Sequence, residues 1–185
     1  MLVWELEQGI RLQGACSVRA PRYLASAGRL YCCDVSGVIS ARTDNGIDFD
    51  LDPEHLLQPT DSELETGGYS AGEVVPPGAS NSEWTMFYSA WQDVSPGTEV
   101  SPHPSHDSSL SEDFAAASIA SDMAGFRSRI FSAHSADGVA WKRDTCVIAG
   151  AGYGERGLDA VHAEDMSLVA LDDGRYRMYY AACDK

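Results

Sequence analysis

The stretch Trp84-Thr85-Met86-Phe87-Tyr88-Ser89-Ala90 is followed, after a long insertion, by Arg129-Ile130-Phe131-Ser132-Ala133-His134-Ser135-Ala136-Asp137-Gly138-Val139-Ala140-Trp141, and this pattern decides the fold because it recurs. An earlier copy occupies 29–33 and 38–49, and a third copy opens at 176–182. Repeats of this size are typical of propeller blades, solenoids and arrays, so we interpret the architecture before assigning chemistry to any residue.

Each repeat carries the pattern of short antiparallel strands. The aromatic segments 83–88 and 175–180 alternate in part and follow turn-forming residues, which is typical of the second strand of a hairpin. Asp-Gly and Asn-Gly pairs tolerate the positive φ of a tight turn and predict a further outer strand. The expected first strands are 17–24, 73–75 and 165–171. Four antiparallel strands per repeat make an all-β protein built of β-propeller blades.

The number of repeats falls short of a closed ring. Residues 3–12 resemble residues 139–148, which follow the Asp-Gly turn of the second repeat. We therefore expect the chain to begin on an outer strand and to end midway through a blade, about two and a half blades against the roughly four to eight of closed propellers. The sequence predicts one domain over 1–185 that is either a fragment of a longer chain or half of a homodimer.

Segment 93–125 is rich in Ser, Pro and acidic residues and is expected to be an inserted loop or short helix. It would cover a pocket or contact another subunit. Its His103, His106 and Asp107 have residue types that bind metals, but no strand or helix fixes them, and we predict no metal site and no cofactor.

Composition limits the partners. The formal net charge is -15, which disfavours nucleic acid and anionic membrane surfaces and leaves a neutral sugar as an acceptable ligand. No apolar run is long enough to span a bilayer and the first residues lack a signal-peptide pattern, so we expect a cytoplasmic protein. The five cysteines lie mostly in apolar strand-like runs, which predicts reduced, buried thiols.

The second repeat has the order aromatic-Met-aromatic-Tyr, a loop, then Arg-Ile-x-x-Ala-x-Ser-x-Asp-Gly-x-x-Trp. This order resembles the blades of the five-bladed propellers of glycoside hydrolase family 43 and its relatives in families 32, 62, 68 and 130. The motif also resembles the Asp box of sialidases, with one residue missing between Asp and Gly. The resemblance implies a five-bladed fold, incomplete in one chain. For Asp44, Phe49, Asp137 and Trp141 we favour a structural role in turns and blade packing.

In those hydrolases the chemistry comes from carboxylates on the inner strands, one to protonate the leaving oxygen and another to activate water or attack the anomeric carbon. The resemblance places such acids at the starts of the inner strands, as Glu73, Glu164 and Asp165, with His162 close by to bind substrate. Glu73 lies among small apolar residues, where burial would raise the pKa of a general acid. A solvated loop acid is its alternative interpretation.

Arg19 is the fourth inner-strand candidate and would bind a sugar hydroxyl or carboxylate. It stands in Arg-Ala-Pro, where a family 32 enzyme would show Arg-Asp-Pro, so one acid of the hydrolase set is missing. The glycine-rich segment 150–157 lacks the βαβ context and the Lys-Ser/Thr of a phosphate loop. We interpret it as a loop between blades whose Tyr153, Glu155 and Arg156 contact a ligand.

Three classes of function remain open from the sequence. The first is a glycoside hydrolase or phosphorylase that uses Glu73, Glu164 and Asp165. The second is a carbohydrate-binding propeller that lacks the complete acid set, as the Ala at position 20 favours. The third is an assembly or scaffold protein that uses its blades as a surface, because one fold hosts many functions.

Overall fold

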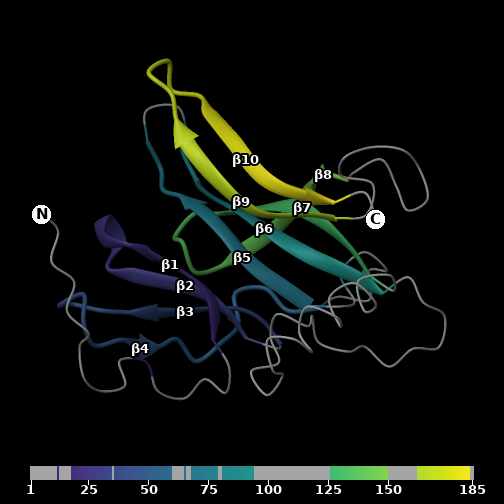
Figure 1. Cartoon of the computed structure of the whole chain (residues 1–185). Helices are drawn as coiled ribbons and strands as arrows, with labels where there is room; N and C mark the ends of the chain where they lie inside the picture. Colours follow the sequence, from purple (N-terminus) through teal and green to yellow (C-terminus); the bar gives the residue numbers. More distant parts are fainter. Residues whose placement is uncertain are drawn as a thin grey trace, which may run out of the picture.

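The structure is a computed structural model, and it describes residues 12, 18–34, 36–59, 65, 68–78, 81–93, 126–149 and 162–183. Within these ranges the chain is all-β apart from the one-turn 3₁₀ helix η1 (Ala25–Ala27). Figure 1 shows the strands gathered into three sheets. The sequence-based prediction of an all-β protein is therefore confirmed.

Two of the sheets are four-stranded antiparallel meanders. The first has the order β1 (Arg19–Leu24), β2 (Arg29–Asp34), β3 (Gly37–Arg42), β4 (Asp50–Leu51). The second has the order β5 (Gly68–Val75), β6 (Trp84–Asp93), β7 (Phe126–Ser135), β8 (Trp141–Ile148). The third is the hairpin of β9 (His162–Ala170) and β10 (Tyr176–Cys183). The repeats expected from sequence thus correspond to the sheets, and no closed ring is present among the described residues.

The Asp-Gly turn between β7 and β8 is held by its own side chains. The Ser135 hydroxyl accepts a hydrogen bond from the Gly138 amide at 2.9 Å, and Asp137 Oδ1 accepts from the amides of Val139 and Ala140 at 2.9 and 2.8 Å. These backbone bonds lower the pKa of Asp137, the bond from Ala140 most. Gly138 has φ +75°, a conformation that glycine adopts without strain.

The turn between β3 and β4 repeats this arrangement. The Thr43 hydroxyl accepts from the Gly46 amide at 2.9 Å, and Asn45 Oδ1 accepts from the amides of Ile47 and Asp48 at 2.8 and 2.9 Å. Asn45, and not Asp44, therefore has the position that Asp137 has in the second sheet. The structural role predicted for these turns is confirmed, with the bonding residue moved by one position.

Aromatic rings fix each turn to the body of the protein. Trp141 donates its indole N–H to the Gly138 carbonyl and stands edge-on to Tyr31, with ring centroids 6.2 Å apart. The Tyr31 hydroxyl donates to the same carbonyl at 3.1 Å, and burial raises the pKa of Tyr31 to about 12. Phe49 stands edge-on to Tyr23 at 5.7 Å. The β7–β8 turn thus packs against the first sheet, whereas the β3–β4 turn packs against a strand of its own sheet.

The second sheet lies between the other two, with both faces of β6 covered. Met86, Tyr88 and Ala90 pack with Tyr31 and other residues of the first sheet in one apolar cluster. Phe87, on the opposite face, packs with Ile130 of β7 and with Ala163, Met166 and Met178 of the β9–β10 hairpin. Successive side chains of a strand point to opposite faces, so the alternation along β6 builds both interfaces.

The first strand of each sheet carries a β-bulge, and β5 lies beside both β1 and β9. In β1 the register shifts between Arg19 and Arg22, and in β5 it shifts between Ala71 and Val74. In β9 the shift lies opposite the step from Tyr179 to Ala181 of the partner strand β10. The bulges hold Ala20 and Pro21, Gly72 and Glu73, and Asp165 and Met166. A Cβ on Gly72 would lie 2.0 Å from Met166 Sδ, so these neighbouring bulges touch.

The cysteine prediction is confirmed where the structure describes the thiols. Cys32 and Cys33 are buried and Cys146 is partly buried, all as free thiols. Burial raises the pKa of Cys32 to about 11, and the charge of Asp34 adds to that shift. In the described part of the chain no helix is long and apolar enough to cross a membrane. Residues 3–11 and 94–125 lie outside the described residues, so their predicted strand and insertion stay predictions.

A buried ion pair ties the end of the first sheet to the second. Glu65 is 4% exposed, and its carboxylate accepts from the hydroxyls of Tyr69 and Tyr88 at 2.7 and 3.1 Å and from Arg143 Nε at 2.9 Å. Arg143 also donates to the carbonyl of Gln58, just beyond the first sheet. Burial first, and then Glu65, raises the pKa values of both tyrosines. Removing one partner of such a pair leaves a buried charge without compensation.

We expect Arg143→Met to lower the free energy of unfolding by about 3 kcal/mol or more, because it leaves the Glu65 carboxylate buried without its cation. Adding Glu65→Gln should recover part of that loss. Denaturant unfolding of the two single variants and the double variant measures the coupling. Lys142→Met, at the exposed neighbouring position of β8, is the matched control. An effect of Arg143→Met no larger than that of Lys142→Met contradicts the prediction.

Candidate functional site

Strand β9 carries three of the residues predicted from sequence, and its first half lies against β6 and β7. Its sequence runs His162-Ala163-Glu164-Asp165, and the pairs Ala181↔Glu164 and Cys183↔His162 fix it to β10. His162 is buried, Glu164 is half-buried and Asp165 is exposed. The chain thus passes from the interior to solvent within four residues, and Glu164 lies at the boundary between the two.

Glu164 is the titrating group of this cluster. Burial raises the pKa of its carboxyl to about 7, and the neighbouring Asp165 charge adds to the shift. The Ser128 hydroxyl of β7 and the Trp91 indole of β6 act in the opposite direction and lower the pKa, by a smaller amount. A carboxyl with such a pKa is half protonated near neutral pH, which suits a general acid.

Ser128 holds the cluster together. It is 1% exposed, it pairs with Trp91 across the β6–β7 ladder, and its hydroxyl accepts the Ala163 amide hydrogen at 3.1 Å. The same oxygen lies 3.0 Å from His162 Nδ1. One hydroxyl therefore contacts both the backbone of β9 and the His162 side chain. Sequence reasoning missed Ser128 and Trp91, although their alternation with Ile130 and Ser89 places them on the face that covers β9.

Asp165 has an unusual backbone. Its φ is +50°, and Ala20 in the β1 bulge has φ +49°. Positive φ costs a residue with a Cβ about 1 kcal/mol, less for Asp than for Ala, and it persists at bulges because packing enforces it. The sequence analysis put Glu73 and Asp165 at the starts of their strands, whereas the structure places both inside strands that begin earlier, at Gly68 and His162. A bulge breaks the alternation from which the starts were inferred.

Glu73 of β5 differs from Glu164 in its surroundings. Its Oε1 lies 3.4 Å from Arg22 Nε of β1, and both side chains are partly exposed. The expected burial among small residues is thus incomplete, and the carboxylate is ion-paired. The sequence offered no signal for Arg22, which only the adjacency of β1 and β5 brings to Glu73.

The remaining predicted residues are placed only in part. Arg19 pairs with Cys33 in the β1–β2 ladder, where its backbone begins the bulge. Tyr153, Glu155 and Arg156 lie outside the described residues. Their roles in binding a ligand stay predictions.

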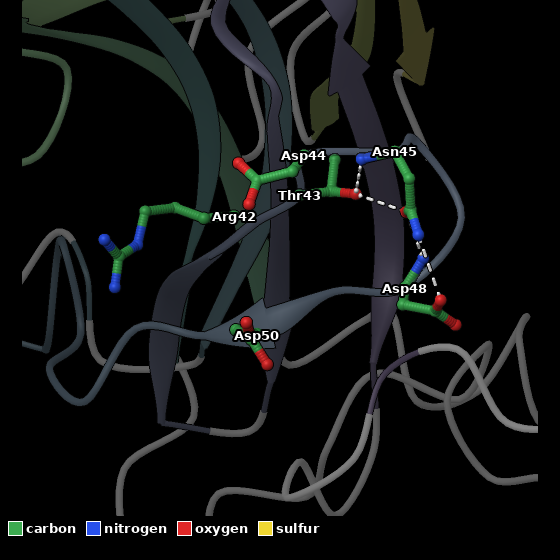
Figure 2. A pocket seen from close by; sticks show the side chains of 6 residues that line it. All are labelled: Arg42, Thr43, Asp44, Asn45, Asp48 and Asp50. Carbon is green, nitrogen blue, oxygen red and sulfur yellow. Dashed lines mark hydrogen bonds between the residues drawn. The ribbon is translucent and has the colours of Figure 1, made fainter.

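A separate hollow of about 300 Å³ opens at the β3–β4 turn and is lined by Arg42, Thr43, Asp44, Asn45, Asp48 and Asp50. Figure 2 shows Thr43, Asn45 and Asp48 joined by hydrogen bonds within the turn, while the Arg42 side chain extends away from them. Arg42 Nε lies 3.1 Å from Asp52 Oδ1. These polar groups serve the turn itself. Within the described ranges no three or more His, Cys, Asp and Glu side chains are grouped to hold a metal ion.

Comparison of the chain with protein-family models, with curated proteins and with solved structures finds no match.

The raised pKa of Glu164 makes stability depend on pH. The ordinary pKa of a glutamate is near 4.5, and the pKa of Glu164 in the folded protein is about 7. Between these two pH values the folded state therefore binds a proton that the unfolded state has lost. Stability due to this group is greatest below about pH 4.5 and is lost as the pH rises through about 7. Glu164→Gln removes the buried charge. We expect this variant to be more stable than wild type by about 2 kcal/mol at about pH 8, with the difference closing near pH 4.

Denaturant unfolding at a series of pH values measures this difference. Glu83→Gln, at an exposed position before β6, is the control and should track wild type throughout. A stability difference for Glu164→Gln that is constant with pH contradicts a raised pKa.

Proposed function

We propose that this chain is a carbohydrate-directed protein of β-propeller type that hydrolyses a glycosidic bond with Glu164 as the proton donor. The support for the propeller is the stacking of antiparallel meander sheets with the first strands β1, β5 and β9 as successive neighbours. In blades the first strand faces the axis, where the larger propellers keep a channel. The resemblance of the repeat motifs to propeller glycosidases supports the substrate class.

The observation that carries the proposal is the pairing of two adjacent carboxyl groups with opposite surroundings. Glu164 is half-buried with a pKa of about 7, and Asp165 next to it is exposed. Two titrating groups whose environments differ in this way are the usual arrangement for an acid and its partner. The strain at Asp165 is of the kind that persists at functional sites.

In the proposed reaction the Glu164 carboxyl transfers its proton to the glycosidic oxygen as the bond from that oxygen to the anomeric carbon breaks. The leaving oxygen keeps the bonding electron pair and departs as an alcohol. Asp165 or Glu73 is the second carboxylate. It either removes a proton from a water that attacks the anomeric carbon, or it bonds to that carbon and is released when a water that gives its proton to the Glu164 carboxylate attacks the same carbon. The protonated state of Glu164 is restored from water.

A second candidate is carbohydrate binding without turnover, and the β1 bulge favours it. That bulge holds Ala20 and Pro21, so it supplies no carboxylate where the bulges of β5 and β9 each supply one. The ion pair of Glu73 with Arg22 further reduces the acids available for chemistry. A pocket with these groups would still hydrogen-bond sugar hydroxyls.

Closure of the ring by a second copy is part of the proposal. The β9–β10 hairpin exposes Tyr179 at 56% and Val169 at 48% on its face away from Met178, which packs on the second sheet. The equivalent face of the second sheet, which carries Phe87, is covered by the β9–β10 hairpin. A second copy of the chain would cover the exposed face in the same way.

We expect turnover of glycosides by the wild type, with a basic limb in kcat/KM near pH 7 that reflects Glu164. Glu164→Gln should lower kcat about 100-fold or more on alkyl glycosides, whose leaving oxygen needs the proton, and much less on nitrophenyl glycosides. Glu83→Gln is the control. Binding of glycans without turnover selects the second candidate, and neither binding nor turnover overturns the sugar-directed function.

We expect a solution mass close to twice the 19.9 kDa of the chain from light scattering coupled to size exclusion. Tyr179→Glu places a charge in the exposed face and should shift the mass toward the monomer, whereas Val147→Glu, at an exposed position of β8 in the second sheet, should leave it unchanged. A wild-type monomer at high concentration contradicts closure by a second copy.

A further inference from the structure

Strand β10 carries the sequence of a central strand but lies at the edge of its sheet. Its segment 178–182 corresponds to residues 86–90 of β6, which has a paired strand on each side. Within the described ranges β10 pairs with β9 alone, and Figure 1 shows it on the outer side of the hairpin. Ser89 and Ala90 of β6 are fully buried, whereas the equivalent Ala181 and Ala182 of β10 are exposed. The sequence of β10 therefore suits a strand with neighbours along both edges.

The edge of β10 also lacks the features that hinder strand pairing elsewhere in the protein. Native sheets protect their edges with bulges, prolines, charged side chains and short strands. Here β1, β5 and β9 each contain a bulge, β4 has two residues, and β8 carries Lys142, Arg143 and Asp144. Strand β10 has eight residues, with Arg177 as its one charged residue and no proline. Among the described strands, its edge is the one open to a further strand.

The other two sheets show which side chains a third strand places beside such a second strand. In both sheets an alanine lies opposite the first of two large residues and a serine opposite the second: Ala133 and Ser132 opposite Met86 and Phe87, and Ala41 and Ser40 opposite Leu30 and Tyr31. Two apolar residues precede each Ser-Ala pair. Small residues leave room for the large side chains of the second strand. The matching partner of β10 is therefore a strand with the order apolar-apolar-Ser-Ala, its Ala opposite Met178 and its Ser opposite Tyr179.

Arg177 adds a charge to this pattern. It is exposed, and its place in the repeat corresponds to that of Arg29 in β2. Arg29 forms an ion pair with the Asp52 carboxylate, which also contacts Arg42, the residue opposite Arg29. Opposite charges on neighbouring strands stabilise the pair, whereas like charges destabilise it. An acidic residue directly after the Ser-Ala pair would lie opposite Arg177 and complement its charge.

We propose that the outer edge of β10 binds an extended segment of a partner protein as a third, antiparallel strand with the pattern apolar-apolar-Ser-Ala-acidic. The added strand would continue the β9–β10 ladder and lie beside Met178, which packs on the second sheet. Its main chain would supply affinity, and its alternate side chains would supply specificity. This binding site is independent of the proposed function, and it uses the edge of the hairpin rather than its outward face.

The described strands of a second copy do not fit this edge. Strands β3 and β7 carry the Ser-Ala pair, but each is already paired on both sides. The β10 strand of a second copy offers Tyr179 and Tyr180, which are large where the pattern needs small residues. A segment of another protein is therefore the occupant.

The test uses a synthetic peptide with the sequence of residues 128–135 and the change His134→Glu, which places the acid opposite Arg177. The peptide is added to ¹⁵N-labelled protein, and amide hydrogen exchange is followed by nuclear magnetic resonance. We expect alternate amides of β10 to exchange at least about tenfold more slowly in the complex, because peptide carbonyls accept their hydrogen bonds. The same peptide with the further change Phe131→Pro interrupts the ladder and should give no protection.

An exchange of charge identifies the edge that binds. Wild-type protein should bind the His134→Glu peptide up to about fivefold more tightly than a His134→Lys peptide, and the protein variant Arg177→Glu should reverse this preference. Lys142→Glu, at an exposed position of the edge strand β8, is the matched control and should keep the wild-type preference.

The proposal is overturned if saturating peptide protects no amide of β10, or if Arg177→Glu and Lys142→Glu show the same preference. Protection without peptide that grows with protein concentration identifies a second copy as the occupant. Protection without peptide at every dilution identifies a strand of the same chain, and either result also overturns the proposal. No glycoside is used, so the outcome is separate from that of the turnover assay.

Discussion

Burial of β6 on both faces is the constraint on which the rest of the structure depends. Met86, Tyr88 and Ala90 pack toward the first sheet, and Phe87 packs toward the β9–β10 hairpin. Few strands of an antiparallel protein are covered twice, because one face of such sheets commonly meets solvent. The double coverage fixes the order of the sheets. It also explains why the aromatic run of residues 84–91 is denser than simple alternation requires.

The candidate site is a consequence of the second of these interfaces. The hairpin lies on β6 and β7 through Ala163 and Met166, and this contact draws Glu164 against Trp91 and Ser128. The positive φ of Asp165 occurs at the same step of the chain, where a bulge lets Met166 turn back to the apolar cluster. Packing of Met166 therefore offsets the local strain. The acid pair lies where it does because the strand must bend to stay packed.

The strand pattern could be predicted from sequence because its signals are local. Aromatic alternation, Asn45-Gly46 and Asp137-Gly138 mark strands and turns through the conformations of those residues alone. Glu164 and Asp165 could be named through the resemblance to propeller glycosidases, which places acids at the starts of the inner strands. Their partners could not, since Ser128 is 34 residues from His162 and lies beyond the 93–125 segment. Glu65 also escaped prediction, because its partners come from β5, β6 and β8, and only packing brings them together.

Glu73, inside the β5 bulge, and Glu164, just before the β9 bulge, show that two acids at similar places in neighbouring strands can have different surroundings. Glu73 lies beside a guanidinium from the neighbouring β1, so its charge is offset by Arg22 across the strands. Burial first, and then the charge of Asp165, raises the pKa of Glu164 to about 7, and the opposing effects of Ser128 and Trp91 are smaller. The packing of the neighbouring strands therefore sets the different surroundings of the two carboxyl groups. Because the third sheet buries Glu164 against the second, whereas Glu73 is partly exposed beside Arg22, the raised pKa arises at Glu164.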